Sequence, residues 1–121
     1  MRALVITVLL AVAVLPCGAT DADDIIMGYG YYKHCSNDER RTTEEVRIGL
    51  TCTVYTTGLV QGMNLINGAG KKMFYELPSG FGMRDVQALL LRYMERHPEK
   101  LQYTTASLLF SALHEAYPGQ S

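Results

Sequence analysis

The sequence has few of the residues that build catalytic or metal sites. It contains three cysteines and three histidines in 121 residues, and the histidines are scattered at His34, His97 and His114. It has no HExxH motif, no cysteine–histidine zinc spacing and no GxSxG element, and no pair of carboxylates stands out from ordinary solvated charge. We therefore expect no catalytic residue, no bound metal and no cofactor, and we predict that the protein is not an enzyme.

An excess of one charge and long internal apolar runs are also missing. After the first 19 residues, the chain carries 10 basic and 12 acidic side chains, a net charge of −2. This gives no electrostatic reason to bind nucleic acid or anionic lipid. No later apolar run approaches the roughly 20 residues of a membrane-spanning helix. We expect a soluble product.

The segment 1–19 has the pattern of an export signal. Arg2 supplies the positive start, Ala3–Leu15 is almost wholly apolar, and Cys17–Ala19 offers small residues for cleavage. About a dozen apolar residues suit a signal peptide and are too few for a spanning helix. We predict cleavage near Ala19, export to the periplasm, and a single domain over 20–121.

Cys17 leaves one alternative open, a lipoprotein anchored through this residue. Pro16 directly before it fits poorly to the small residue that lipoprotein processing prefers. We therefore favour a cleaved signal.

Two cysteines, Cys35 and Cys52, remain after cleavage. In an exported protein, an even pair is most simply a disulfide, and closing a loop of this length contributes about 3 kcal/mol. The rival interpretation is a catalytic Cys35 assisted by the adjacent His34. Sequence neighbours rarely form a working nucleophile–base pair, and Cys52 would then be left unexplained.

Helical periodicity dominates the C-terminal half. From Arg84, apolar residues recur with the spacing of one helix face, and Pro98 indicates that this helix stops at His97. Pro98 suits the first position of a second helix, whose apolar pattern continues to Ala116, before Tyr117–Gly119. We predict an all-α, small four-helix-type domain.

Two further helices are predicted upstream. Asp23–Cys35 forms the first, and Thr42 with Glu45 forms a capping box for a second that runs to about Leu65. The disulfide would clamp these two helices. Gly58 and Gly62 indicate the close approach of a neighbouring helix. The remaining stretch, 67–83, is the longest irregular segment, and such loops are often functional.

The motifs follow a recognisable order. After Cys35 come Cys52-x-x-Tyr55-x-x-Gly58-x-x-x-Gly62, a loop with Pro78, Tyr93, His97-Pro98-Glu99-x-Leu101 and Ala112-Leu113-x-x-Ala116-Tyr117-Pro118. This order resembles the Rap/Tai family of type VI secretion immunity proteins over about 24–118. Many members carry a cysteine shortly before the loop proline, where this chain has Leu77, so the loop would be freer here than usual.

The resemblance implies a periplasmic protein that binds and blocks a peptidoglycan amidase toxin, so that the cell wall is protected. It implies that the Cys35–Cys52 pair is the family's disulfide. It also implies a possible homodimer, and a protruding loop that occludes the toxin's catalytic groove. We expect the contact surface on the 67–83 loop and structural roles for the motif residues. The expected contacts are Lys71, Lys72, Phe74 and Tyr75. The motif residues are Tyr55, Gly58, Gly62, Tyr93, His97, Pro98, Tyr117 and Pro118.

Two other classes of protein compete with this interpretation. A small periplasmic stress protein or chaperone would bind many clients, but the few histidines and the near-neutral charge give it weaker support. A small periplasmic enzyme would need a nucleophile or a metal that the sequence does not offer.

Overall fold

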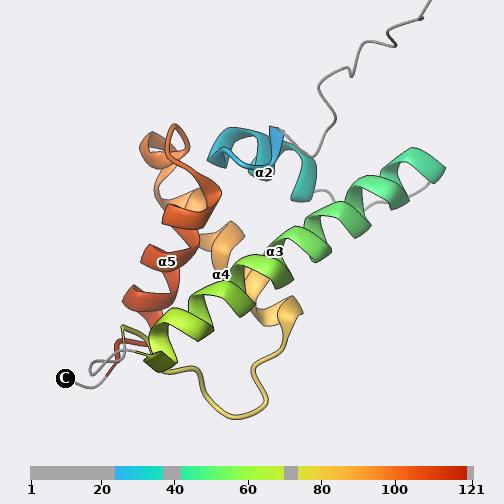
Figure 1. Cartoon of the computed structure of the whole chain (residues 1–121). Coiled ribbons are helices and arrows are strands. Elements are labelled where there is room, and N and C mark those ends of the chain that lie inside the picture. The colour runs from blue at the N-terminus through green and yellow to red at the C-terminus, as the bar shows by residue number, and fades with distance from the viewer. Residues whose placement is uncertain (1–23, 37–41, 70–73, 120–121) are drawn as a thin grey trace, which may run out of the picture.

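The computed structural model describes residues 24–36, 42–69 and 74–119, which fold into four α-helices and one short 3-10 helix (Figure 1). Their bounds are α2 Gly28–Cys35, α3 Thr43–Ala69, α4 Met83–Arg96, η1 Pro98–Lys100 and α5 Thr105–Ala116. The described part contains no extended strand, which confirms the all-α prediction. The predicted signal, 1–19, lies outside the described residues. No helix in the described ranges is long and apolar enough to cross a membrane.

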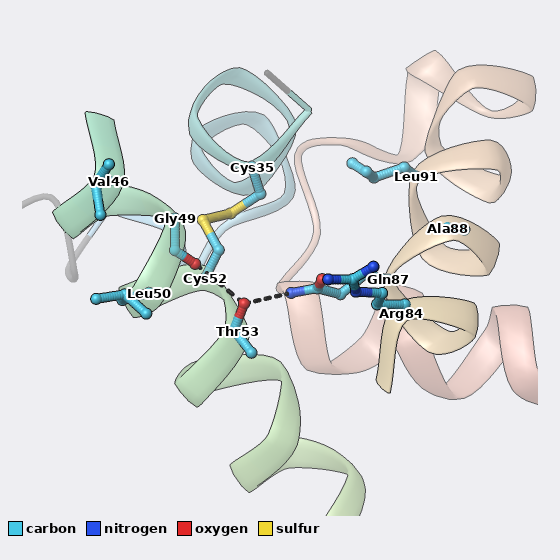
Figure 2. A pocket seen from close by; sticks show the side chains of 10 residues that line it. All are labelled: Cys35, Val46, Gly49, Leu50, Cys52, Thr53, Arg84, Gln87, Ala88 and Leu91. Carbon is cyan, nitrogen blue, oxygen red and sulfur yellow. Dashed lines mark hydrogen bonds between the residues drawn. A yellow bond between two sulfur atoms is a disulfide. The ribbon is translucent and has the colours of Figure 1, made fainter. Parts of the chain in front are cut away.

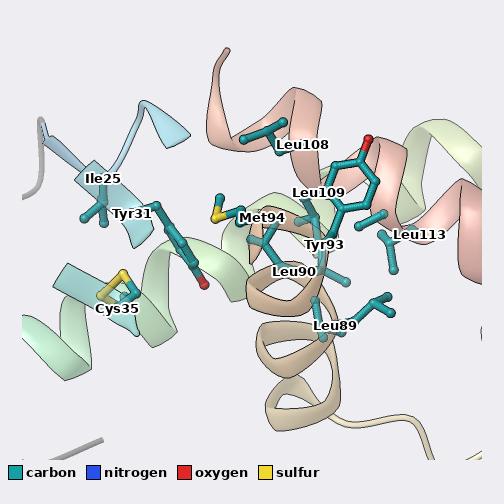
Figure 3. Close-up of a cluster of buried hydrophobic side chains, with 14 of the residues drawn as sticks. Ile25, Tyr31, Cys35, Leu89, Leu90, Tyr93, Met94, Leu108, Leu109 and Leu113 are labelled. Atoms are coloured by element: carbon teal, nitrogen blue, oxygen red, sulfur yellow. A yellow bond between two sulfur atoms is a disulfide. The ribbon is translucent and has the colours of Figure 1, made fainter. Parts of the chain in front are cut away.

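The hydrophobic core lies where α4 and α5 pack against each other and against α2 (Figure 3). The periodic apolar residues of the two C-terminal helices fill it, as the sequence predicted. On α4 these are Val86, Leu89, Leu90, Tyr93 and Met94, and on α5 they are Leu108, Leu109, Ala112 and Leu113. From the N-terminal side, Ile25 and Tyr31 belong to the same cluster.

The sequence predicted one break between two helices, but a short 3-10 helix, η1, lies between α4 and α5. His97 ends α4, and Pro98 is the first residue of η1, not of the long helix we expected. α5 begins only at Thr105, because the Thr104 hydroxyl accepts a hydrogen bond from the Ser107 N–H at 3.2 Å and so caps a new helix. The expected single helix over 98–116 is therefore wrong.

The predicted capping box opens α3. The Thr42 N–H donates to the Glu45 carboxylate, and the Glu45 N–H donates to the Thr42 hydroxyl, both at 3.1 Å. The helix then runs to Ala69, four residues beyond the predicted end. One face of α3 packs on the core through Cys52, Thr56 and Val60.

Among the described residues, the expected close approach of a helix at Gly58 and Gly62 is wrong. A Cβ built on either glycine would meet nothing within 4 Å. Glycine in an exposed helix costs about 1 kcal/mol relative to alanine. The described part of the chain therefore supplies no packing that would offset the cost of these two residues.

α2 is shorter than predicted because backbone hydrogen bonds to the segment before α5 occupy its start. Gly28 N–H donates to Tyr103 O and Tyr29 N–H to Leu101 O, each at 2.9 Å. Met27 forms an isolated antiparallel bridge with Thr104. Met27 is extended and follows a turn at residues 25–26, so α2 begins at Gly28 instead of Asp23.

Two contacts clamp α2 onto α3. The predicted Cys35–Cys52 disulfide is confirmed, with a Cα–Cα distance of 5.8 Å. One turn further along, the buried Tyr31 hydroxyl lies 2.7 Å from the hydroxyl of Thr56, which donates its own proton to Cys52 O at 2.7 Å. The Thr56 proton is thus already used, so Tyr31 is the donor in this pair. Burial raises the pKa of Tyr31, so the phenol stays protonated.

Removing the disulfide tests the clamp. Replacing both Cys35 and Cys52 with alanine should lower the free energy of unfolding by about 3 kcal/mol in the chain-entropy picture, because the unfolded chain regains the freedom of the closed loop. Urea denaturation of the oxidised chain and the double variant measures the difference. Equal midpoints would show that the bridge contributes nothing.

Gly28 tests the packing of α2 on α5. A Cβ there would lie 2.6 Å from Leu108 Cδ1 and 2.8 Å from Leu101 O. We expect Gly28→Ala to lower the free energy of unfolding by on the order of 1–3 kcal/mol, measured by thermal denaturation. The control is Gly68→Ala, where nothing lies within 4 Å. A Gly28→Ala variant as stable as this control would contradict the packing.

Candidate functional site

The predicted binding loop divides into a part that the structure describes and a part that it does not. Lys71 and Lys72 lie outside the described residues. Phe74 is 45% exposed, whereas Tyr75 is only 2% exposed and belongs to the core. The expectation of Tyr75 as a contact residue does not fit this burial. Of the four predicted contacts, Phe74 alone is described at the surface.

Asn67, in the last turn of α3, fixes the segment that carries Phe74. Its side-chain amide donates to Tyr75 O at 2.9 Å, and its carbonyl accepts from the Phe74 N–H at 2.7 Å. Asn67 is buried, so these hydrogen bonds form away from competing water. One side chain therefore satisfies both backbone groups.

Tyr75 anchors the same segment from its other side. Its hydroxyl donates to the Asn64 side-chain carbonyl at 2.7 Å, which ties the loop to α3 a second time. Burial raises the pKa of Tyr75 above its ordinary value. The phenol thus acts as a hydrogen-bond donor in a largely apolar setting.

The C-terminal residues pair with this segment as a short antiparallel ribbon. Tyr75 forms a bridge with Pro118. Glu76 N–H donates to Tyr117 O at 3.0 Å, and Gly119 N–H donates to Phe74 O at 3.2 Å. Asn67 ties the end of α3 to the same segment, so α3 ends close to this ribbon (Figure 1). Tyr117 and Pro118 therefore support the loop exit.

These anchors present an aromatic surface, which we define as Phe74, Phe110 and His114. The Phe74 and Phe110 rings meet edge to face at 5.5 Å between centroids, and the Phe110 and His114 rings lie parallel at 6.3 Å. His114 Nδ1 lies 2.6 Å from Phe74 O, so this nitrogen carries the proton that it donates to the carbonyl. All three residues are exposed. Aromatic side chains that are rigid and exposed are typical of protein–protein contacts.

Sequence reasoning missed Phe110, Asn67 and the contact made by His114. Phe110 and His114 lie four residues apart on α5, next to the buried stripe of Leu109 and Leu113. That spacing is the only signal that could have placed them together. Nothing in the sequence indicated that Asn67 reaches forward to bind the backbone.

A hollow of about 570 Å³ opens between α4 and the disulfide end of α3 (Figure 2). Gln87 spans it by donating to the Thr53 hydroxyl at 3.4 Å. It is lined by Cys35, Val46, Gly49, Leu50, Cys52, Thr53, Arg84, Gln87, Ala88 and Leu91. Among the described residues that line it, Arg84 is the ionisable one apart from the oxidised cysteines, so this lining offers no nucleophile–base pair.

The other residues that the sequence offered for catalysis or metal binding make structural contacts. Cys35 is in the disulfide, so the rival pairing of a free Cys35 thiol with His34 is excluded. His97 packs on the ring of Tyr93 at 4.5 Å, and the Tyr93 hydroxyl accepts a hydrogen bond from Lys100 at 3.1 Å. Among the described residues, no group of three or more His, Cys, Asp and Glu side chains could hold a metal ion.

The fold and surface define a small, disulfide-clamped helical protein with an exposed aromatic surface. The family model described as Rap1a immunity proteins matches residues 27–119, which is most of the chain. The chain therefore belongs to the Rap1a immunity protein family, as the sequence motifs indicated. No curated protein and no solved structure matches it.

Asn67 offers a test of how the aromatic surface is held. Asn67→Ala leaves the Phe74 N–H and the Tyr75 carbonyl without their partner, so we expect the free energy of unfolding to fall by about 1–3 kcal/mol. Asn67→Asp should lose at least as much, because its buried carboxylate would place an oxygen against the Tyr75 carbonyl in place of the amide donor. Urea denaturation ranks the two variants. An alanine variant as stable as the wild type would contradict this role.

Proposed function

We propose that this protein is a periplasmic immunity protein that binds a type VI secreted peptidoglycan amidase and blocks it. Family membership establishes the coarser statement that it is a type VI effector immunity protein. The export pattern of residues 1–19 supports a location where a wall-cutting enzyme acts. In this proposal the protein acts by binding alone, and it performs no reaction.

The aromatic surface is the observation that carries the binding part of the proposal. Phe74 follows the predicted contacts Lys71 and Lys72 in the sequence, and Phe110 and His114 on α5 contact it. Exposed aromatic rings cost little conformational entropy when they are buried by a partner, so they make effective anchors. Phe74 would then lie at the rim of the toxin's groove.

The anchoring of this surface suits an inhibitor. Asn67, Tyr75 and the C-terminal ribbon hold the Phe74 backbone before any partner arrives. A surface that is already ordered does not lose this freedom on binding, which favours tight association. We also propose that two copies of the chain associate, as the resemblance implies.

The binding proposal predicts a loss of affinity without a loss of fold. Replacing Phe74 or Phe110 with alanine should weaken binding to the peptidoglycan amidase encoded beside this gene by at least about tenfold, as expected for a hot-spot residue. The melting temperature should change little, since both rings are exposed. Calorimetric titration and inhibition of wall hydrolysis measure the effect.

Tyr103→Ala is the matched control, because Tyr103 is an exposed aromatic residue outside the aromatic surface. We expect this variant to bind like the wild type. Equal losses for Tyr103 and Phe110 would contradict the assigned surface. Failure of the wild type to bind any neighbouring wall hydrolase would contradict the proposed function itself.

A further inference from the structure

The Cys35–Cys52 bridge forms part of the wall of the hollow between α3 and α4. Both side chains are buried, but Cys35 keeps 7% of its surface exposed, whereas Cys52 keeps 1%. In the view of Figure 2, the Cys35 sulfur lies on the side of the bridge that is nearer to α4, which forms the opposite wall. The volume of about 570 Å³ is that of a small-molecule site. The bridge is therefore open to a small reagent through this hollow.

One weak contact crosses the hollow. The Gln87 side-chain amide donates to the Thr53 hydroxyl at 3.4 Å, which is longer than the usual limit of about 3.2 Å for such hydrogen bonds. The contact is also exposed, so water competes for both groups. An entering molecule can therefore replace it at little cost.

The hollow carries a positive charge that its lining does not balance. Arg84 lies in the first turn of α4, and its side chain forms no hydrogen bond or ion pair with another residue of the described ranges. The neighbouring Asp85 caps the helix by accepting the Gly82 N–H at 2.9 Å. The connector between Cys35 and Thr42 contains two acidic and two basic residues, so its net charge is zero. Because a guanidinium stays protonated, the hollow attracts anions.

We propose that this hollow is a thiol-exchange site, at which a small anionic thiol such as glutathione opens the bridge in the folded protein. The thiolate attacks the Cys35 sulfur and forms a new S–S bond, while the Cys35–Cys52 bond breaks and Cys52 leaves as a thiolate. A second thiolate attacks the external sulfur of this mixed disulfide and releases Cys35. The bridge gains two electrons, and the two external thiols are oxidised to a disulfide. The proposal depends on neither the toxin nor the association of two copies.

The fold keeps the two sulfurs close after the bridge opens. Tyr31 donates to the Thr56 hydroxyl, and Thr56 donates to Cys52 O, both at 2.7 Å in a buried setting. These hydrogen bonds hold α2 on α3 without help from the disulfide. The Cys52 thiolate therefore stays beside the mixed disulfide on Cys35, where it can attack the Cys35 sulfur and restore the bridge. The first exchange step is thus reversible in the folded chain.

Reduction of the oxidised, exported chain at low ionic strength tests the site. The reagents are 2-mercaptoethanesulfonate, 2-mercaptoethanol and cysteamine, which are an anion, a neutral molecule and a cation. Each rate is divided by the rate at which the same thiol reduces a small neutral disulfide. We expect the anion to exceed the cation at least about fivefold, as a unit charge about 4 Å away in water allows. Equal rates, or the preference for the cation that the net negative charge of the chain would give, would overturn the proposal.

Arg84→Gln removes the charge without touching the clamp. We expect the preference for the anionic thiol to fall to less than about twofold in this variant. Arg92→Gln is the matched control, because Arg92 lies two turns further along α4 and outside the lining of the hollow. It should keep the preference of the wild type. The same loss in both variants would show a general effect of charge and would overturn the assigned site.

The same reaction distinguishes exchange in the folded chain from reduction after unfolding. Urea below the unfolding transition should change the rate by less than about twofold. Asn67→Ala, which acts at the far end of α3, should likewise be reduced at the wild-type rate although it is expected to unfold more easily. A route through unfolding would be at least about fivefold faster for a loss of about 1 kcal/mol. Rates that follow the unfolded fraction, measured by circular dichroism, would overturn the proposal.

Single-cysteine variants identify the sulfur that is attacked. Cys52→Ser leaves the Cys35 thiol, which we expect to react with glutathione disulfide at least about tenfold faster than the Cys52 thiol that Cys35→Ser leaves. The two variants lose the same bridge, so each is the control for the other. If they unfold, peptide mass mapping of acid-quenched reactions of the wild type with glutathione gives the same comparison. An adduct found mainly on Cys52 would overturn the proposed order of attack.

Discussion

The clamp between α2 and α3 is the constraint on which the rest of the structure depends. α2 has eight residues, fewer than an isolated helix needs in water, and α3 is rich in threonine and glycine. Neither helix is expected to be stable alone. The Cys35–Cys52 bridge and the Tyr31–Thr56 hydrogen bond hold them together, and Tyr31 also reaches the α4–α5 core. Through this side chain, the N-terminal half is joined to the better-packed C-terminal half.

α3 links the clamp to the candidate site. Its first half carries Cys52 and Thr56, and its last turn carries Asn67, which sets the backbone of Phe74. The position of the aromatic surface is therefore defined by the helix that the disulfide holds in place. The inner face of α3 is used by the core, and its outer face is left apolar and uncharged. One helix thus connects the packing of the core with the aromatic surface.

The sequence was most informative where a local rule decides the structure. The α4 and α5 stripes, the Thr42 capping box and the cysteine pair follow from spacing and capping chemistry, and the structure confirms them. It was least informative where distant segments meet. Backbone hydrogen bonds to the segment before α5 shift the start of α2 to Gly28. Asn67 binds the backbone of Tyr75, which lies eight residues further along the chain. Burial of Tyr75 beside an exposed Phe74 likewise depends on partners far away in sequence.

The disulfide gives the fold a dependence on its surroundings that extends to its lifetime. A copy kept in a reducing compartment would lack the bridge, and a loss of about 3 kcal/mol raises the unfolded fraction more than a hundredfold. Unfolded chains are the ones that proteases remove. Oxidation would therefore act as a maturation step, so that the long-lived pool of protein consists of chains that have reached an oxidising environment.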